Sequence, residues 1–324
     1  MTDRLSRAVK TFACSAVFCA LLSQAAAADV TIQVGYGPGG ATDVYSRIAS
    51  RHLSKYLPGT PDVNVVNVPG AGGKRLLKMA HAASETDGSV IYAVGFTVVT
   101  RTVMQDSFDG NEIAKLSPLG SFGRDFPFCW SAKNVAPLDR AALVAPGTKY
   151  GATGKGSSTY ALPMGIKQAL GADFNIVLGY SGAAEVFAAL ERNEVDLVCG
   201  VDPTNPDQFR VAASFTREGL DPAPAYPVIL DMIEDDASVE LITALTDQTY
   251  PSIPFFVAAQ TGADTLALYR EAFQKLLVDP EFLTDMAATK LDLNPLAAVE
   301  LDALIDSYAT MDEALRDRII ALTE

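Results

Sequence analysis

Cysteine, histidine and tryptophan are scarce in this chain of 324 residues, which contains four, two and one of them respectively. The two histidines, His52 and His81, fall on expected helix faces, and neither lies near a cysteine or at a metal-ligand spacing. Packing or solvent exposure accounts for histidines in such positions. We therefore expect no enzyme activity, no cofactor and no metal site.

Basic residues are also in the minority, with 25 lysines and arginines against 39 acidic residues and a formal net charge of −14. This balance argues against nucleic acid as a partner, because binding to phosphates requires clustered positive charge. An anionic ligand would approach against the long-range field of the chain. Local hydrogen-bond donors would then have to provide its affinity.

Long apolar runs are missing except near the N-terminus, where Phe12–Leu22 follows three basic residues and precedes Ala25–Ala28. A transmembrane helix needs about 20 apolar residues, so this pattern indicates a secretory signal peptide, residues 1–28, cleaved before Asp29. A retained membrane anchor is the alternative. We expect a periplasmic mature chain of 22 basic and 38 acidic residues, with a charge of −16.

Two of the four cysteines, Cys14 and Cys19, lie within the expected signal peptide, which leaves Cys129 and Cys199 in the mature chain. In an oxidising compartment these two could form a disulfide. Alternatively, both are small buried apolar residues, as free cysteines often are. Their separation of 70 residues does not decide between the two.

The mature length exceeds what one core normally holds, which favours two lobes. Short apolar strands alternate with helical patterns, and this order is typical of an α/β fold with mainly parallel sheets. We assign residues 29–125 and 254–324 to lobe 1 and residues 126–253 to lobe 2.

The expected elements follow from apolar periodicity and from glycine or proline punctuation. We expect an irregular stretch from Asp106 to Lys133, where the chain crosses between lobes and where Phe122, Phe126, Phe128 and Trp130 cluster. The C-terminal helices should close against lobe 1. The expected strands are 30–35, 63–67, 90–94, 149–152, 175–178, 195–200, 209–215 and 254–259, and the expected helices are 42–56, 76–83, 159–170, 183–191, 233–245, 263–277, 280–289 and 295–323.

Four glycine-rich turns, 37–40, 68–73, 153–158 and 179–182, each lie between the end of an expected strand and the start of an expected helix. Helix N-termini carry unpaired N–H groups and a positive dipole end, which together favour anions. Ligands of open α/β sheets gather beyond the carboxyl ends of strands. The alternative is that glycine and proline merely mark surface turns.

Three motifs occur in order: Tyr36-Gly37-Pro38-Gly39-Gly40-Ala41-Thr42-Asp43, Val66-Asn67-Val68-Pro69-Gly70-Ala71-Gly72-Gly73, and Thr86-Asp87-Gly88. They resemble the successive motifs of substrate-binding proteins of tripartite tricarboxylate transporters, the TctC/Bug family. Gly154–Thr159, Tyr180-Ser181-Gly182, and Ala188–Leu190 with Glu194-Val195-Asp196-Leu197 continue the resemblance. It covers nearly the whole mature chain, although the part from Ile233 onward matches in pattern alone.

The resemblance implies a type II periplasmic-binding-protein fold, in which two α/β lobes enclose an organic acid. It also implies that the ligand passes to integral membrane subunits of a tripartite transporter; a periplasmic sensor is the alternative. The sequence says nothing of oligomeric state, and a monomer is the default expectation. Asp43 would orient and cap its turn. The implied ligand-binding positions are Tyr36, Gly39, Thr42, Asp43, Ala71, Gly72, Ser157, Ser158, Thr159, Tyr180 and Ser181.

The chain departs from the family pattern at three places: Ser181 stands where lysine or another large residue is usual, Tyr160 where histidine is common, and Lys74-Arg75 follows the second turn. The identity of the acid is therefore open. One hypothesis is that Lys155, which two glycines flank, contacts a second anionic group. Lys74 or Arg75 could do the same, and for each the alternative is a solvated side chain.

Two other classes of function compete with this interpretation. Gly35, Gly37 and Gly40 have the G-x-G-x-x-G spacing of a dinucleotide-binding enzyme, but Pro38 and the lack of an acidic residue at the expected place weaken it. An adhesin would need an exposed apolar patch. The aromatic cluster of residues 122–130 could supply one, but we expect it to pack where the lobes join.

Overall fold

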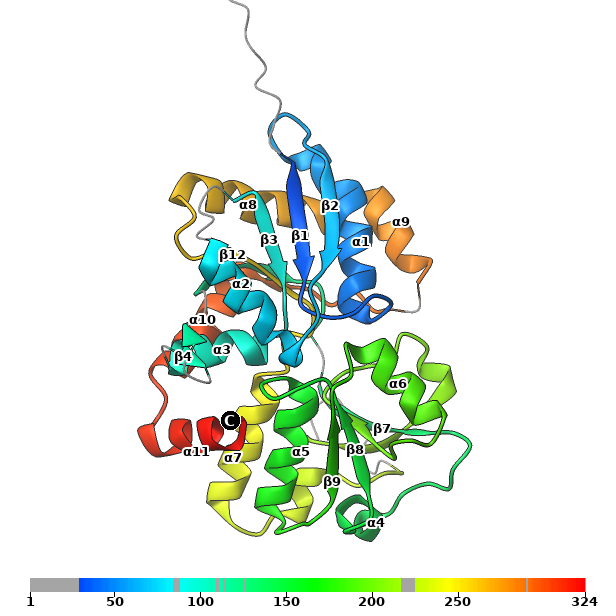
Figure 1. Ribbon diagram of the computed structural model, residues 1–324. Coiled ribbons are helices and arrows are strands. Elements are labelled where there is room, and N and C mark those ends of the chain that lie inside the picture. Colours follow the sequence, from blue (N-terminus) through cyan, green and yellow to red (C-terminus); the bar gives the residue numbers. More distant parts are fainter. Residues whose placement is uncertain are drawn as a thin grey trace, which may run out of the picture.

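The computed structural model describes residues 29–83, 88–105, 107–108, 111–112, 115–124, 126–216, 225–289 and 291–323. The expected signal peptide and the Thr86-Asp87 pair lie outside these residues. Figure 1 shows two α/β halves, one above the other, each with its own strands and helices. None of the described helices has the length and apolar content needed to cross a membrane.

The first half contains a six-stranded sheet in the order β13-β6-β12-β3-β1-β2. Strands β1, β2 and β3 run parallel, and β12 runs antiparallel to both β3 and β6. The carboxyl ends of β1, β2, β3 and β6 therefore meet at one edge. The strands are β1 (Val30–Val34), β2 (Val63–Asn67), β3 (Val90–Ala93), β6 (Leu116–Ser121), β12 (Pro254–Ala258) and β13 (Leu296–Ala297).

Helices cover both faces of this sheet (Figure 1). One core contains Ile48, Phe273 and Phe282 from α1, α8 and α9; a second contains Leu77 and Val98 from α2 and α3. Apolar residues on one side of each helix produce this burial. The helices are α1 (Ala41–Leu53), α2 (Lys74–Ala83), α3 (Phe96–Met104), α8 (Ala263–Leu276), α9 (Pro280–Ala287) and α10 (Ala298–Ala309).

The second half contains two strand groups that one isolated bridge joins. Strand β8 (Lys149–Ala152) pairs in parallel with β9 (Asn175–Leu178), and β7 (Phe128–Ala132) pairs antiparallel with β10 (Val198–Cys199) and β11 (Phe209–Ser214). The bridge Tyr150–Leu197 connects them. Helices α5 (Ser158–Ala169) and α6 (Ala183–Glu191) pack on these strands, α7 (Asp236–Asp247) packs against α5, and the short helix α4 (Arg140–Val144) precedes β8.

The expected helix 295–323 is two helices, α10 and α11 (Glu313–Thr323). The Asp312 carboxylate accepts the N–H groups of Ala314 and Leu315 and so begins α11. We expected this last helix to close against the first lobe. It packs instead against α5 and α7 as well as α3. One apolar core accordingly includes residues of both halves. The lobe boundaries stay predictions.

The stretch 106–133 is not irregular, because its described part includes β6 and β7. Its aromatic residues also separate. Phe122 is fully buried in the first core, where it stacks on Phe273 at a centroid distance of 5.2 Å. Phe128 and Trp130 belong to β7 and meet edge to face at 6.0 Å. The cluster is therefore no single patch.

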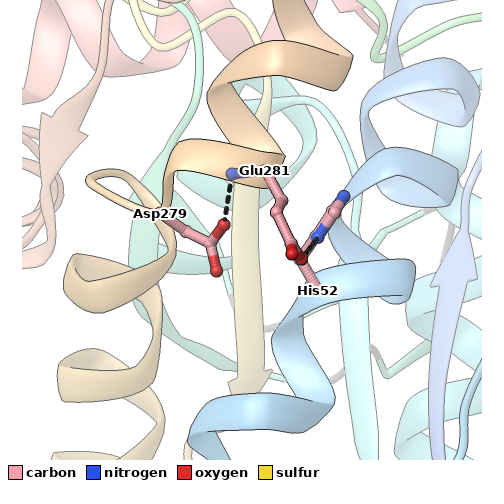
Figure 2. Close-up of side chains that lie close together, drawn as sticks. All are labelled: His52, Asp279 and Glu281. Carbon is pink, nitrogen blue, oxygen red and sulfur yellow. Dashed lines mark hydrogen bonds and ion pairs between the residues drawn. The ribbon is translucent and has the colours of Figure 1, made fainter.

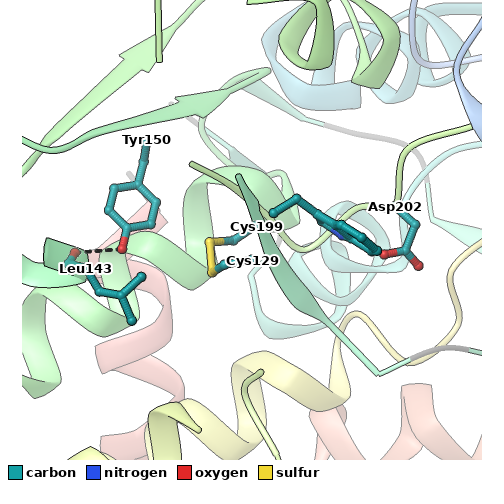
Figure 3. Close-up of a disulfide and its surroundings, with 6 residues drawn as sticks. Cys129, Leu143, Tyr150, Cys199 and Asp202 are labelled. Atoms are coloured by element: carbon teal, nitrogen blue, oxygen red, sulfur yellow. Dashed lines mark hydrogen bonds between the residues drawn. A yellow bond between two sulfur atoms is a disulfide. The ribbon is translucent and has the colours of Figure 1, made fainter. Parts of the chain in front are cut away.

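Cys129 and Cys199 form a disulfide, which settles the alternative that the sequence left open. They are paired residues on the antiparallel strands β7 and β10. Figure 3 shows the bridge between Tyr150, whose hydroxyl donates to the Leu143 carbonyl at 2.8 Å, and Asp202. Both cysteines are fully buried, so the bridge lies inside the second half.

Candidate functional site

The first glycine-rich turn leads from β1 into α1 and is held by the carboxylate of Asp43. This carboxylate accepts the Gly39 N–H at 2.9 Å, the Asn67 side-chain amide at 2.9 Å and the Arg47 guanidinium at 2.9 and 3.1 Å. The Asn67 amide also donates to the Tyr36 carbonyl. Asp43 thus ties the turn to its own helix and to the end of β2.

Only 3% of Asp43 is exposed. Burial alone would raise the pKa of its carboxyl, but hydrogen bonds from Arg47, the Gly39 N–H and Asn67 outweigh burial and hold the pKa below its ordinary value. The group stays ionised, and the adjacent guanidinium offsets its charge. Asp43 therefore adds little net negative charge to its surroundings.

Tyr36 connects the first turn to the start of α3. Its hydroxyl accepts the Gly95 N–H at 3.0 Å. Burial raises the pKa of the phenol to about 12, and this hydrogen bond reduces the effect only in part. Tyr36 is therefore a neutral spacer between two helix N-termini.

The second turn follows β2 and contains the short helix η2 (Ala71–Gly73) before α2. Its backbone is unusual, since Gly70, Ala71, Gly72 and Gly73 all have positive φ, with values of 142°, 48°, 65° and 101°. A Cβ atom on Gly72 would lie 2.8 Å from the Gly154 carbonyl oxygen. The second turn therefore touches the third turn, across the boundary between the halves.

The third turn leads from β8 into α5, and its hydroxyl groups bond to one another. The Thr159 hydroxyl lies 2.8 Å from that of Ser157 and accepts the Thr153 N–H at 3.1 Å. The Ser157 hydroxyl also donates to the Gly154 carbonyl. This network fixes the N-terminal turn of α5.

The fourth turn packs against the first. The Gly37 N–H donates to the Ser181 carbonyl at 2.8 Å, and the Ser181 N–H donates to the Glu185 carboxylate at 2.5 Å. Tyr180 is half-buried beside them. The four turns thus meet in two pairs, one turn of each pair from each half.

A cavity of about 540 Å³ lies between the halves. The N-terminal residues of four helices line it: Gly40, Ala41, Thr42 and Asp43 of α1, Gly95 and Thr97 of α3, Ser157, Ser158 and Thr159 of α5, and Ala183 of α6. Each N-terminus presents backbone N–H groups and the positive end of a helix dipole. Their convergence creates a site for an anion.

The structure separates the eleven expected ligand-binding residues into two groups. Six line the cavity: Tyr36, Thr42, Asp43, Ser157, Ser158 and Thr159. The other five are not among its lining residues: Gly39, Ala71, Gly72, Tyr180 and Ser181. These five belong to the turns that meet across the boundary, and the assignment of all eleven to a ligand stays a prediction.

The three lysine and arginine candidates do not line the cavity, and Lys155 is exposed. Arg124, which sequence reasoning missed, does line it. The half-buried Arg124 follows β6, and its guanidinium donates to the Asn294 side-chain oxygen at 3.2 Å. No motif marks Arg124, because its place depends on strands distant in the sequence.

His52 was expected to be away from any metal-ligand arrangement, yet the structure brings it to two carboxylates. Atoms of His52, Asp279 and Glu281 lie within 4.8 Å of one another (Figure 2). The Lys55 ammonium lies among them, at 2.9 Å from Asp279, 2.5 Å from Glu281 and 3.2 Å from His52 Nδ1. A cationic side chain therefore takes the position that a metal ion would need.

No known family profile matches the chain, and no curated protein matches it. Many solved structures match its fold, among them the following three. The periplasmic binding protein BugD has a TM-score of 0.66 at 17% identity, over 91% of this chain and 97% of that one. MatC from Rhodopseudomonas palustris with bound malate has a TM-score of 0.66 at 18% identity, over 91% of this chain and 99% of that one. R. palustris Rpa4515 with adipate has a TM-score of 0.63 at 15% identity, over 91% of this chain and 97% of that one.

These matches extend over nearly the full length of each protein and therefore include both halves. They confirm the expected fold class, because about 91% of this chain superposes with a TM-score of 0.66. The chain has the type II periplasmic-binding-protein fold, in the form that BugD and MatC adopt.

Proposed function

We propose that this chain is an extracytoplasmic solute receptor of the TctC/Bug type, which captures a small organic acid between its two lobes. The observation that carries the proposal is the convergence of the α1, α3, α5 and α6 N-termini on one cavity. The matched structures with malate and with adipate support a carboxylate as the ligand. We place lobe 1 at residues 29–125 and 254–324 and lobe 2 at residues 126–253.

In this proposal the ligand carboxylate accepts N–H groups at the start of α1 and of α5. The hydroxyls of Thr42 and Ser158 add donors from both lobes, while the Thr159 hydroxyl donates to Ser157 and holds the third turn in shape. Asp43 does not touch the ligand; it holds the first turn in shape through Gly39. The carboxylate therefore favours the closed state, because only there do both lobes reach it.

The five expected residues outside the cavity lining have a different role. Tyr180 packs against the apolar core of the second half, whereas Gly39, Ala71, Gly72 and Ser181 form contacts through which the turns of one lobe meet those of the other. They set how closely the lobes approach, and thereby the size of the site.

Thermal unfolding with a panel of mono-, di- and tricarboxylates, aromatic acids and amino acids tests the proposal. A ligand at a hundredfold over its dissociation constant adds about 2.7 kcal/mol to the free energy of unfolding. Ser158→Ala should weaken the best acid about tenfold, since it removes a hydrogen bond to a charged group. Ser307→Ala, on the exposed side of α10, is the matched control.

A shift with an organic acid that Ser158→Ala reduces and Ser307→Ala does not would support the receptor. Absence of any shift across the panel, with the protein folded, would overturn it, and so would turnover of the acid. We further propose that the protein works in the periplasm and delivers its bound acid to the integral membrane subunits of a tripartite transporter. Loss of uptake of the identified acid, in cells that lack this chain, is the corresponding test.

A further inference from the structure

Arg124 lies at the edge of the first sheet that faces the second half. It follows β6 and forms an isolated antiparallel bridge with Pro251, just before β12 begins. The Ser252 N–H donates to the Gly123 carbonyl beside it at 3.1 Å. The backbone of Arg124 is therefore fixed at the edge where β1, β2 and β3 also end.

Asn294 forms hydrogen bonds with both the backbone and the side chain of Arg124. Its side-chain amide donates to the Arg124 carbonyl at 2.9 Å, and its side-chain oxygen accepts from the guanidinium at 3.2 Å. Among the described residues this is the one hydrogen-bond partner that we find for the guanidinium. A guanidinium has five N–H donors, so most of them remain for a group inside the cavity.

Arg124 is also the one lysine or arginine among the described residues that line the cavity. The acidic residues of the lining differ in their surroundings. Arg47 offsets Asp43, the Trp130 indole N–H donates to Asp202 at 2.9 Å, and Asp292 is exposed. Arg124 is thus the cationic end of a cavity whose other anion-binding end is the set of helix N-termini.

The strand order places these two ends well apart. Helix α1 follows β1, Arg124 follows β6, and the order β6-β12-β3-β1 puts three strand spacings between them. At about 4.8 Å per spacing, this is about 14 Å between the strand axes. Phe126, Phe128 and Trp130 line the cavity as well, and they provide an apolar surface for the carbon chain of a ligand.

We propose that Arg124 is a specificity-determining residue that receives the second anionic group of a dianionic ligand, an α,ω-dicarboxylate with an apolar middle. This rests on the proposed receptor function. One carboxylate binds at the helix N-termini, and the other forms a charge-assisted hydrogen bond with Arg124. Asn294 keeps the guanidinium in place for it.

Titration calorimetry with linear diacids from succinate to sebacate, each paired with the monoacid of equal carbon number, tests the proposal. Arg124→Gln should weaken the best diacid by about 10- to 100-fold, since it removes a hydrogen bond between charged groups. The paired monoacid should change less than about threefold, because it has no second carboxylate to lose. Lys155→Gln removes an exposed charge outside the cavity lining and serves as the control.

Equal weakening of the diacid and the monoacid by Arg124→Gln would show a general charge effect on approach and would overturn the inference. An unchanged diacid affinity would also overturn it, and both outcomes leave the receptor function intact. If neither acid of any pair binds the unchanged protein, while the broader panel is also silent, the receptor function itself fails. The two failures are therefore distinguishable.

Discussion

Gly72 and Gly154 lie against each other across the boundary between the two halves. A Cβ atom on Gly72 would lie 2.8 Å from the Gly154 carbonyl oxygen, and one on Gly154 would lie 2.6 Å from the Gly72 nitrogen. Real Cβ atoms do not approach backbone atoms so closely. Because both neighbours are backbone atoms, neither side can yield by a change of rotamer.

Gly154→Ala should therefore prevent the closed approach of the second and third turns. Gly154 does not have a positive φ, so alanine adds bulk without backbone strain. Overpacking costs about 1–3 kcal/mol, which corresponds to a loss of about 5- to 150-fold in ligand affinity. Small-angle scattering with and without the acid should show less compaction than in the unchanged protein.

Gly147→Ala is the matched control, because no atom lies within 4 Å of the position of its added Cβ. It should keep both the affinity and the compaction. If Gly154→Ala also kept both, the contact between the turns would not limit closure.

Asp43→Asn should lower the free energy of unfolding by about 1–3 kcal/mol at neutral pH, because the Gly39 N–H and Arg47 lose an ionised acceptor. The folded-state pKa of Asp43 is below its ordinary value of 3.8. The stability that ionised Asp43 provides is therefore complete above about pH 4 and is lost as the pH falls through the folded pKa. The difference between the two proteins should shrink on acidification.

Urea unfolding from pH 7 to pH 2.5 measures this difference. Asp173→Asn is the control, since the side chain of Asp173 is 88% exposed. A gap between Asp43→Asn and the unchanged protein that stayed constant over this range would contradict the role given to the carboxylate.

Local pattern predicted the βα units well, because their signals lie within a few residues. Strand 149–152 and helix 183–191 have the expected bounds, and the turns around Gly37 and Gly154 lie where helices begin. Helix α3 was missed: Phe96–Met104 is rich in β-branched residues, which are typical of strands, and eight of its nine residues are buried, its threonines and Arg101 included.

The rest of the site depends on contacts between residues far apart in the sequence. Arg124 reaches the cavity through strand pairing with residues near Pro251, and Lys55 meets Asp279 more than 200 residues later. The pairing of Cys129 with Cys199 depends likewise on the register of β7 against β10. Spacing along the chain does not encode these distances.

Reduction of the Cys129–Cys199 disulfide should destabilise the protein. Loss of a crosslink between residues 70 apart lowers the free energy of unfolding by about 4 kcal/mol in the chain-entropy account. Guanidinium unfolding with and without a reductant measures the effect. Cys129→Ala with Cys199→Ala should unfold at the lower midpoint under both conditions.

Ligand affinity should fall with reduction too, because Phe128 and Trp130 flank Cys129, Gly200 follows Cys199, and all three line the cavity. If thiol titration confirms reduction and the unfolding midpoint of the unchanged protein does not fall, the predicted loss of stability is contradicted.

Lys55→Ala should turn the His52, Asp279 and Glu281 cluster from an ion pair into a site open to a divalent cation. In the unchanged protein the Lys55 ammonium lies within 3.2 Å of all three side chains, so zinc should not raise its unfolding midpoint. Without metal, removal of this partly exposed ion pair should lower the unfolding midpoint only slightly. Added zinc should then stabilise the variant, because one nitrogen and two carboxylates are suitable ligands.

Lys275→Ala removes an exposed ion pair with Glu271 on α8 and should show no gain with zinc. Equal stabilisation of the unchanged protein by zinc would mean that Lys55 does not exclude the ion.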